Sequence, residues 1–153
     1  MENRNIVAAA NTLNVVINKV FYTGKVHVSG GREGFAKSTD RHLDVALSSP
    51  GSSSGKGTNP EQLFAAGWAA CFIGAMKHNA PNLQIAMPAD AAIDAEVDLA
   101  LADDGFNLQA RLNVILPGLT FEEAHAVVEA AHQTCPYSKA TRGNMNVQIN
   151  VAI

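Results

Sequence analysis

The chain contains two cysteines, and both stand in surroundings where a thiol could do chemistry. Cys71 lies inside the apolar stretch FAAGWAACFIGAM, and Cys135 directly precedes a proline in HQTCPYSKATRGN. A thiolate is a strong nucleophile, and two thiols that meet can be oxidised to a disulfide. Free cysteines are also among the most buried residue types, so the alternative is that both are small hydrophobic side chains of the core.

Two charged residues could change the chemistry of the first thiol. Arg32 lies in the glycine-rich segment SGGREG, and Glu61 lies in NPEQLF. A guanidinium is always charged, so if Arg32 reaches Cys71 it favours the thiolate and lowers the thiol pKa. Glu61 could then orient Arg32 through a bidentate ion pair.

The elements that must position these residues can be read from the apolar pattern. Residues 13 to 47 alternate around SGGREG and predict short antiparallel strands. Asn59 can cap a helix that starts with Pro60 and ends near residue 79, before Pro81. Residues 65 to 76 include no charged side chain, so this helix is expected to be buried on all sides.

The second half of the chain predicts a hairpin, a helix and a last strand. Apolar residues alternate over 93 to 101 and 106 to 116, on either side of the turn ADDG. Thr120 and Glu123 form a capping box for a helix to about residue 134, ended by Pro136, and residues 145 to 153 alternate again. The order β-β-β-α-β-β-α-β predicts one α+β domain over residues 1 to 153, with antiparallel sheets around a buried helix.

Composition narrows the function classes. Charged residues make up 16% and apolar residues 47% of the chain, which favours an oligomer with a large buried interface. The net charge is −3 and the basic residues are scattered, so neither nucleic acid nor a membrane surface is an expected partner. The apolar stretch from 63 to 76 is shorter than the roughly 20 residues that cross a bilayer, and asparagines interrupt the N-terminal segment. We therefore expect no signal peptide and a cytoplasmic location.

From about residue 18 onward the chain resembles the organic hydroperoxide resistance branch of the OsmC/Ohr family. The resemblance is carried by GGREG, NPEQLFAAGWAACF, LPGLTFEEAH, AAHQTCPYSKATRGN and the alternating last strand. It implies an OsmC-like fold, in which antiparallel sheets wrap around the central helices of an intertwined homodimer. Residues 1 to 17 are an N-terminal extension to which no role is assigned. Arg41 follows Asp40 where the family pattern has a glycine, which leaves the type of that turn open.

The resemblance also implies an activity. Family members of this branch are thiol peroxidases for alkyl and fatty-acid hydroperoxides, without metal, haem, flavin or another cofactor. Cys71 corresponds to the residue that attacks the peroxide and becomes a sulfenic acid, and Cys135 to the residue that forms a disulfide with it. Arg32 and Glu61 correspond to the charged pair that activates the thiolate. The implied reductant is a dihydrolipoyl group on a lipoylated protein.

Helix geometry raises the question of where the charged pair acts. At about 1.5 Å per residue, Glu61 and Cys71 lie about 15 Å apart along one helix. Either Arg32 bridges part of that gap or a second subunit supplies Arg32 and Glu61, and the apolar helix favours the second subunit.

Apolar residues near the thiols could bind the alkyl tail of a substrate. The candidates are Phe35, Phe64, Trp68, Phe72 and Met76. Because a buried helix shows the same residue types, the alternative is that they belong only to the core.

Other functions compete with the peroxidase. One is a thiol redox sensor or apolar-ligand-binding module without turnover, although no basic DNA-reading helix is apparent. Another is the sister OsmC subgroup, with the same chemistry and different loops. The segment GSSSGKG lacks the spacing of a phosphate-binding loop, and His125 and His132 lack a third metal ligand. Arg142 is expected to anchor the turn before the last strand.

Overall fold

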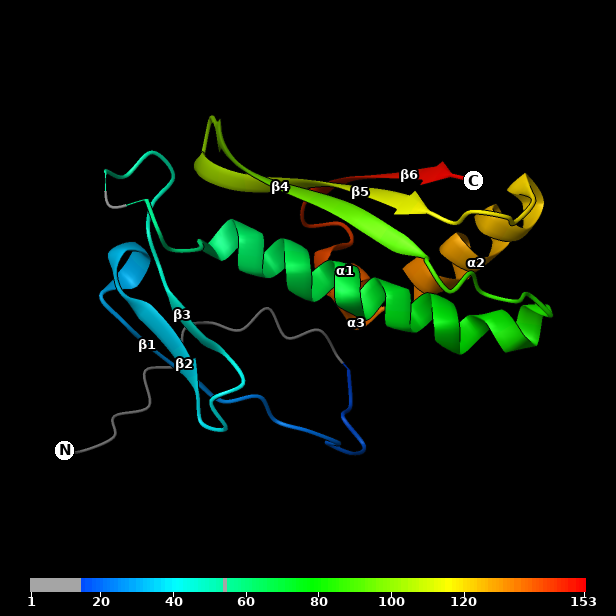
Figure 1. Ribbon diagram of the computed structural model, residues 1–153, viewed down its shortest axis with the longest axis horizontal. Helices are drawn as coiled ribbons and strands as arrows, with labels where there is room; N and C mark the ends of the chain where they lie inside the picture. Colours follow the sequence, from blue (N-terminus) through cyan, green and yellow to red (C-terminus); the bar gives the residue numbers. More distant parts are fainter. Residues whose placement is uncertain (1–14, 54) are drawn as a thin grey trace.

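The computed structural model describes residues 15–53 and 55–153, and they form two three-stranded sheets and three α-helices. The first sheet is antiparallel, as the sequence predicted, and consists of β1 (Val26–Ser29), β2 (Phe35–Ser38) and β3 (Asp44–Ala46). A short 3-10 turn, η1 (Gly31–Glu33), connects β1 to β2. Figure 1 shows this small sheet near the N-terminal end of α1 (Pro60–Asn79), apart from the second sheet.

The start of α1 follows the predicted signals. The side chain of Asn59 accepts a hydrogen bond from the backbone amide of Gln62 at 2.9 Å, and proline occupies the first helical position. The helix ends at Asn79 and continues into the 3-10 turn η2 (Ala80–Leu83).

Burial of α1 is one-sided, so the expectation that this chain buries the helix on all sides was wrong. Trp68, Phe72 and Met76 are fully buried and lie one turn apart on one face. Ala66 and Ala70 are exposed on another face. The physical reason is that one sheet and two neighbouring helices pack against only part of the helix surface, which leaves an apolar face open.

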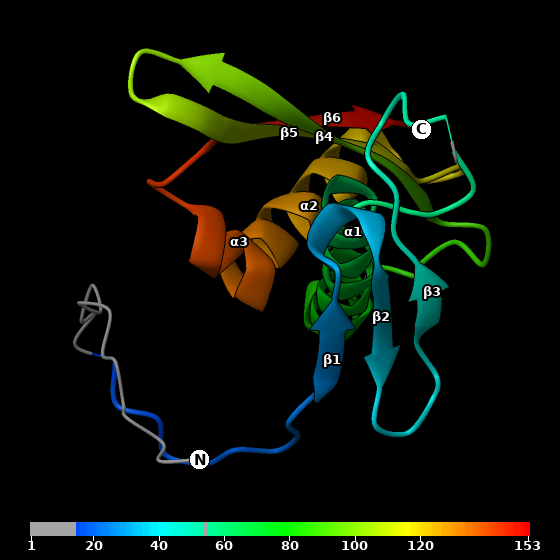
Figure 2. The same ribbon diagram turned by 90° about the vertical axis from the view of Figure 1, so that its left-hand side faces the viewer.

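The second sheet has the order β4 (Ala92–Ala102), β5 (Gly105–Ile115) and β6 (Asn146–Ala152). Strands β4 and β5 form the predicted antiparallel hairpin, but β6 pairs parallel with β5, which corrects the expectation of purely antiparallel sheets. Two helices connect β5 to β6, and such a helical crossover brings the chain back to the same end of the sheet. Figures 1 and 2 show this sheet lying over α1 and α2.

These two connecting helices meet at the second cysteine. The predicted capping box of Thr120 and Glu123 is present at the start of α2 (Phe121–Thr134). Pro136 does end that helix, yet it also begins α3 (Pro136–Thr141), which the sequence reading missed. Proline is favoured in the first turn of a helix, so the signal was present in the sequence. The kink leaves Cys135 at the junction of α2 and α3.

The hydrophobic core lies between the inner face of the second sheet and the helices. Leu112, Val114 and Leu116 are fully buried and pack in one cluster with Trp68 and Phe72. Within the described parts of the chain, none of the helices is both long enough and apolar enough to cross a membrane.

The turn between β2 and β3 retains a left-handed residue. Arg41 has a φ of 64°, so an arginine occupies the conformation that a glycine adopts more easily. Asp40 supports this turn, since its carboxylate accepts hydrogen bonds from the Ser38 hydroxyl and from the amide of His42.

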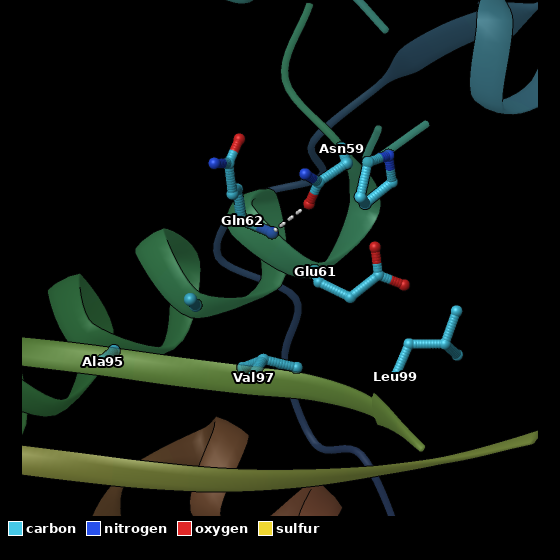
Figure 3. Close-up of a pocket in the computed structure, with 8 residues that line it drawn as sticks. Asn59, Glu61, Gln62, Ala95, Val97 and Leu99 are labelled. Carbon is cyan, nitrogen blue, oxygen red and sulfur yellow. Dashed lines mark hydrogen bonds between the residues drawn. The ribbon is translucent and has the colours of Figure 1, made fainter. Parts of the chain in front are cut away.

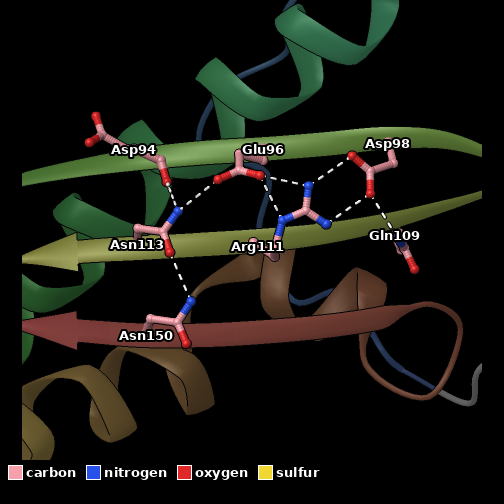
Figure 4. A network of polar contacts seen from close by, with 7 residues as sticks. All are labelled: Asp94, Glu96, Asp98, Gln109, Arg111, Asn113 and Asn150. Carbon is pink, nitrogen blue, oxygen red and sulfur yellow. Dashed lines mark hydrogen bonds and ion pairs between the residues drawn. The ribbon is translucent and has the colours of Figure 1, made fainter.

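The outer face of the second sheet carries a polar network (Figure 4). Arg111 donates to both oxygens of Asp98, at 2.8 and 2.9 Å, and to Glu96 at 2.6 Å. Asn113 links Glu96 to Asn150 on β6. These residues alternate with the buried ones because side chains of a strand point to opposite faces.

This network should make the stability of the protein sensitive to acid. Arg111, followed by Gln109, lowers the pKa of Asp98 from 3.8 to about 2. A folded-state pKa below the unfolded one means that this stabilisation is present above about pH 4 and is lost as the pH falls toward 2. We expect the difference in free energy of unfolding between the wild type and Asp98→Asn to shrink from about pH 5 to about pH 2.5, measured by urea denaturation. An equal difference at both pH values would contradict this assignment.

Candidate active site

The two cysteines lie in contact although they are far apart in the sequence. Their sulfur atoms are 3.5 Å apart, and both are free thiols. Cys71 on α1 is partly buried, whereas Cys135 is fully buried at the junction of α2 and α3. A disulfide has a sulfur–sulfur distance of about 2.0 Å. A small movement of the α2–α3 junction toward α1 would therefore bring the two sulfur atoms to bonding distance.

In the isolated chain, the surroundings of Cys71 favour the neutral thiol. Burial raises the pKa of Cys71 first, and the contact with Cys135 raises it further, while a hydrogen bond from the backbone amide of Tyr137 lowers it. The net shift is upward from the ordinary value. A positive group near the sulfur would oppose this shift and favour the thiolate, which is the nucleophilic form.

Arg32 and Glu61 form the bidentate ion pair that the sequence suggested. The guanidinium nitrogens of Arg32 lie 2.9 and 2.6 Å from the two carboxylate oxygens of Glu61. The hydrogen bond with Arg32 lowers the pKa of Glu61 and raises that of Arg32. The side chain of Arg32 is 41% exposed against 11% for Glu61, so the guanidinium has an open side toward solvent.

The local backbone explains the placement of Arg32. Gly30 and Gly31 adopt positive φ angles of 74° and 58°, which turn the chain into η1. The neighbouring Glu33 holds the loop that follows β3, since its carboxylate accepts a hydrogen bond from the amide of Ser49 at 2.9 Å. This loop leads to the N-terminus of α1, where Glu61 lies in the first turn.

The charged pair and the thiol pair are separate within one chain. Glu61 precedes Cys71 by nearly three helical turns, about 15 Å along α1. The groups that shift the pKa of Cys71 are its burial, Cys135 and the Tyr137 amide, and Arg32 is not among them. Within one chain, the Arg32–Glu61 pair and the Cys71–Cys135 pair are therefore two separate clusters along α1.

Glu61 borders a cavity of about 340 Å³ between the start of α1 and β4. Figure 3 shows Glu61 beside Val97 and Leu99 of β4, with Asn59 and Gln62 joined by the capping hydrogen bond. The cavity is open and combines a carboxylate with apolar side chains.

The predicted tail-binding residues lie in different places. Trp68, Phe72 and Met76 are fully buried in the core, so they are closed to a ligand in this chain. Phe35 on β2 is 43% exposed and contacts His27. Phe64 borders a second cavity of about 440 Å³. The other large apolar side chains of that cavity are Leu99, Phe106, Leu108, Tyr137 and Met145.

Two residues near the thiols, Tyr137 and Ser138, make contacts that were not anticipated from the sequence. Tyr137 follows Cys135 closely, its backbone amide bonds to Cys71, and its ring packs edge-on against Phe64. Ser138 is fully buried and accepts a hydrogen bond from the indole nitrogen of Trp68 at 3.3 Å. Recognising that Pro136 starts a helix would have placed both residues on its first turn.

The residues discounted for catalysis have structural contacts. Arg142 donates a hydrogen bond to the backbone carbonyl of His132, in line with its expected role before the last strand. Burial, followed by Arg142, lowers the pKa of His132. Within residues 15–53 and 55–153, no group of three His, Cys, Asp or Glu side chains is arranged to hold a metal ion.

Comparison with known proteins shows what this arrangement is similar to. Residues 51–150 match the family described as OsmC-like protein. The organic hydroperoxide resistance protein of Xanthomonas axonopodis pv. citri is 47% identical over 137 residues, which cover 88% of this chain and 96% of that protein. The structure of an organic hydroperoxide resistance protein OsmC from Legionella pneumophila is 42% identical, with a TM-score of 0.81 over 88% of this chain and 100% of that chain. OhrB of Bacillus subtilis is 41% identical, with a TM-score of 0.78 over 87% and 100% of the two chains.

Proposed function

Since the chain belongs to the OsmC/Ohr family, we propose that it is a thiol peroxidase that reduces organic hydroperoxides to alcohols and contributes to resistance against them. The observation that carries the proposal is the 3.5 Å contact between the sulfur atoms of Cys71 and Cys135. Relatives that cover most of the chain are named for organic hydroperoxide resistance, which supports the choice of substrate class.

The reaction consists of two steps at sulfur. The Cys71 thiolate attacks the terminal oxygen of the hydroperoxide, the O–O bond breaks, and the alkoxide leaves as an alcohol after taking up a proton. Cys71 is then a sulfenic acid. Cys135 attacks its sulfur, a disulfide forms, and the hydroxyl leaves as water.

A dithiol must then return the enzyme to its starting state. A dihydrolipoyl group on a lipoylated protein supplies two thiols, and it leaves as the cyclic disulfide when both cysteines are reduced. We propose a cytoplasmic location for this cycle, because the reduced dithiol that it needs persists in a reducing compartment.

We propose that the activating charge comes from a second copy of the chain. An antiparallel pair of α1 helices that cross near residue 66 places Glu61 of one copy at the axial level of Cys71 in the other. Ala66 and Ala70 are exposed on α1, and such small side chains allow a close approach of two helices. The open side of Arg32 could then face the partner's thiol and favour its ionised form.

Further apolar surface supports the homodimer. Large hydrophobic side chains of the first sheet and of the hairpin tip are exposed in the single chain. They are Val26, Val28, Phe35, Leu99, Leu101 and Phe106. An exposed apolar surface of this kind is typical of a protein–protein interface, and a dimer that wraps one chain around the other would cover it.

Substrate preference should follow from the cavity beside Phe64. Because its amide contacts Cys71 and its ring borders this cavity, Tyr137 connects the apolar space to the reacting sulfur. We expect kcat/KM for cumene hydroperoxide to exceed that for hydrogen peroxide about tenfold or more, because only the organic substrate gains apolar contacts. Equal values for the two peroxides would rule out a tail-binding cavity.

A count of free thiols tests the proposed function directly. Reduced protein is mixed with one equivalent of cumene hydroperoxide, and thiols are titrated after denaturation. We expect the loss of both thiols of a chain and a disulfide-linked peptide pair that contains Cys71 and Cys135. Full retention of the thiols after peroxide addition would overturn the proposal.

A further inference from the structure

Gly67 on α1 has no conformational reason to be glycine. It lies inside a regular helix, where glycine costs about 1 kcal/mol relative to alanine, and its φ is not positive. A methyl group at this position would lie 3.1 Å from the hydroxyl oxygen of Tyr137 and 3.5 Å from the adjacent ring carbon. By contrast, a methyl group at Gly74, further along the same helix, meets nothing within 4 Å. The absent side chain of Gly67 therefore makes room for one particular ring.

The ring of Tyr137 fastens α3 to α1. Its centroid lies 6.1 Å from that of Phe64 in an edge-on contact, and Phe64 packs on Trp68 in the same way at 5.7 Å. The indole nitrogen of Trp68 completes the attachment through its hydrogen bond to the buried Ser138. The first turn of α3 is thus attached to one turn of α1 by neighbouring side chains.

This attachment lies next to the reacting sulfur. Cys71 follows Gly67 by four residues, so the two positions are neighbours on one face of α1. The peptide segment that carries Tyr137 also carries Cys135, which touches Cys71 at 3.5 Å, and the Tyr137 amide that bonds to the same sulfur. A displaced ring would shift both groups away from Cys71 together.

We infer that Gly67 is a positioning residue: the space that it leaves seats Tyr137, and the seated Tyr137 holds the backbone amide and Cys135 against the Cys71 sulfur. The inference rests on the proposed function only for its consequence in turnover, because the seating itself is a property of the resting protein.

A mutant cycle separates this steric role from a general effect on the helix. Gly67→Ala is compared with the unmodified position in two backgrounds, wild type and Tyr137→Phe. The Tyr137→Phe change removes the oxygen at 3.1 Å and leaves the ring carbon at 3.5 Å, an ordinary contact distance. It leaves the backbone amide in place.

We expect Gly67→Ala to slow disulfide formation after peroxide addition by about ten- to a hundredfold in the wild-type background, because small displacements at a reacting centre have effects of this size. In the Tyr137→Phe background the same substitution should change the rate less than about twofold. Equal effects in both backgrounds, or no effect in either, would overturn the inference. Alanine favours the helix, so loss of the fold is not expected, and circular dichroism checks this.

A second measurement does not depend on peroxide chemistry. The rate of iodoacetamide alkylation of Cys71 is followed against pH, with Cys135 replaced by serine in every variant. Gly67→Ala should move the midpoint to higher pH, because the Tyr137 amide no longer stabilises the thiolate. The Tyr137→Phe change should restore the midpoint. If no variant reacts with peroxide, the proposed function fails, yet this alkylation profile still decides whether Gly67 positions Tyr137; an unchanged midpoint would count against it.

Discussion

Replacing Cys71 by serine should lower the hydroperoxide reductase rate by about a thousandfold or more, because a serine hydroxyl is not an effective nucleophile toward a peroxide oxygen. Cys135 should not take over the reaction, since its side chain is fully buried while that of Cys71 is partly open. Initial rates with cumene hydroperoxide and a dithiol reductant measure the effect.

Replacing Cys135 by serine should have a different consequence. Cys71 still reacts once, but its sulfenic acid lacks the thiol that lies 3.5 Å away in the wild type. Further equivalents of peroxide should then produce sulfinic and sulfonic acids, which thiols do not reduce. Intact-protein mass spectrometry distinguishes these products from the disulfide of the wild type. Identical oxidation products in Cys135→Ser and in the wild type would show that the two cysteines do not have distinct roles.

Mixing an impaired and an inactive variant should restore activity if the site is shared between subunits. Arg32→Ala keeps the thiol pair and loses the cation, so its thiolate fraction near neutral pH should fall about tenfold or more. Cys71→Ser keeps the cation and loses the nucleophile. A heterodimer of the two contains one complete site, made of Cys71 from the first chain and Arg32 from the second. Random exchange at equal amounts should therefore recover about a quarter of wild-type activity, since half the dimers are mixed and each has one of two sites.

The matched control is a mixture of Arg32→Ala with the double variant Arg32→Ala/Cys71→Ser, which contains no complete site in any pairing. Subunits are exchanged by joint unfolding and refolding, and the mixed dimers are verified by mass spectrometry of differently tagged chains. Verified mixed dimers without recovered activity would show that Arg32 and Cys71 must belong to the same chain. In that case η1, which carries Arg32, must move toward Cys71 to close the axial gap of about 15 Å.

The local elements were predictable because their signals lie close together in the sequence. The Asn59 cap, the capping box at Thr120 and the alternation of the β4–β5 hairpin all appear in the structure as predicted. Each depends on contacts between residues a few positions apart or on a simple side-chain period. The pairing of Arg32 with Glu61 was also anticipated, from residue types and a family resemblance.

Other features depend on contacts between segments that are far apart in the sequence. The parallel pairing of β6 follows from the helical crossover formed by α2 and α3. Helix α3 was not predicted from the sequence, because Pro136 both ends α2 and begins α3, and only the first effect was considered. The burial of Trp68, Phe72 and Met76 in the core, with Phe64 at a cavity, depended on which face of α1 meets the sheet. A helix without charged residues over most of its length carries no periodic signal for that choice.

The sequence alone determined which residues can do the chemistry: two thiols, a guanidinium and a carboxylate, on elements whose starts and ends are set by local capping and alternation. The tertiary structure decided which of them meet. It brought Cys135 to Cys71 and Arg32 to Glu61, and it kept the two pairs apart along α1. The physical reason is that local signals act over a few residues, whereas contacts across 64 or 29 residues depend on packing of the whole core.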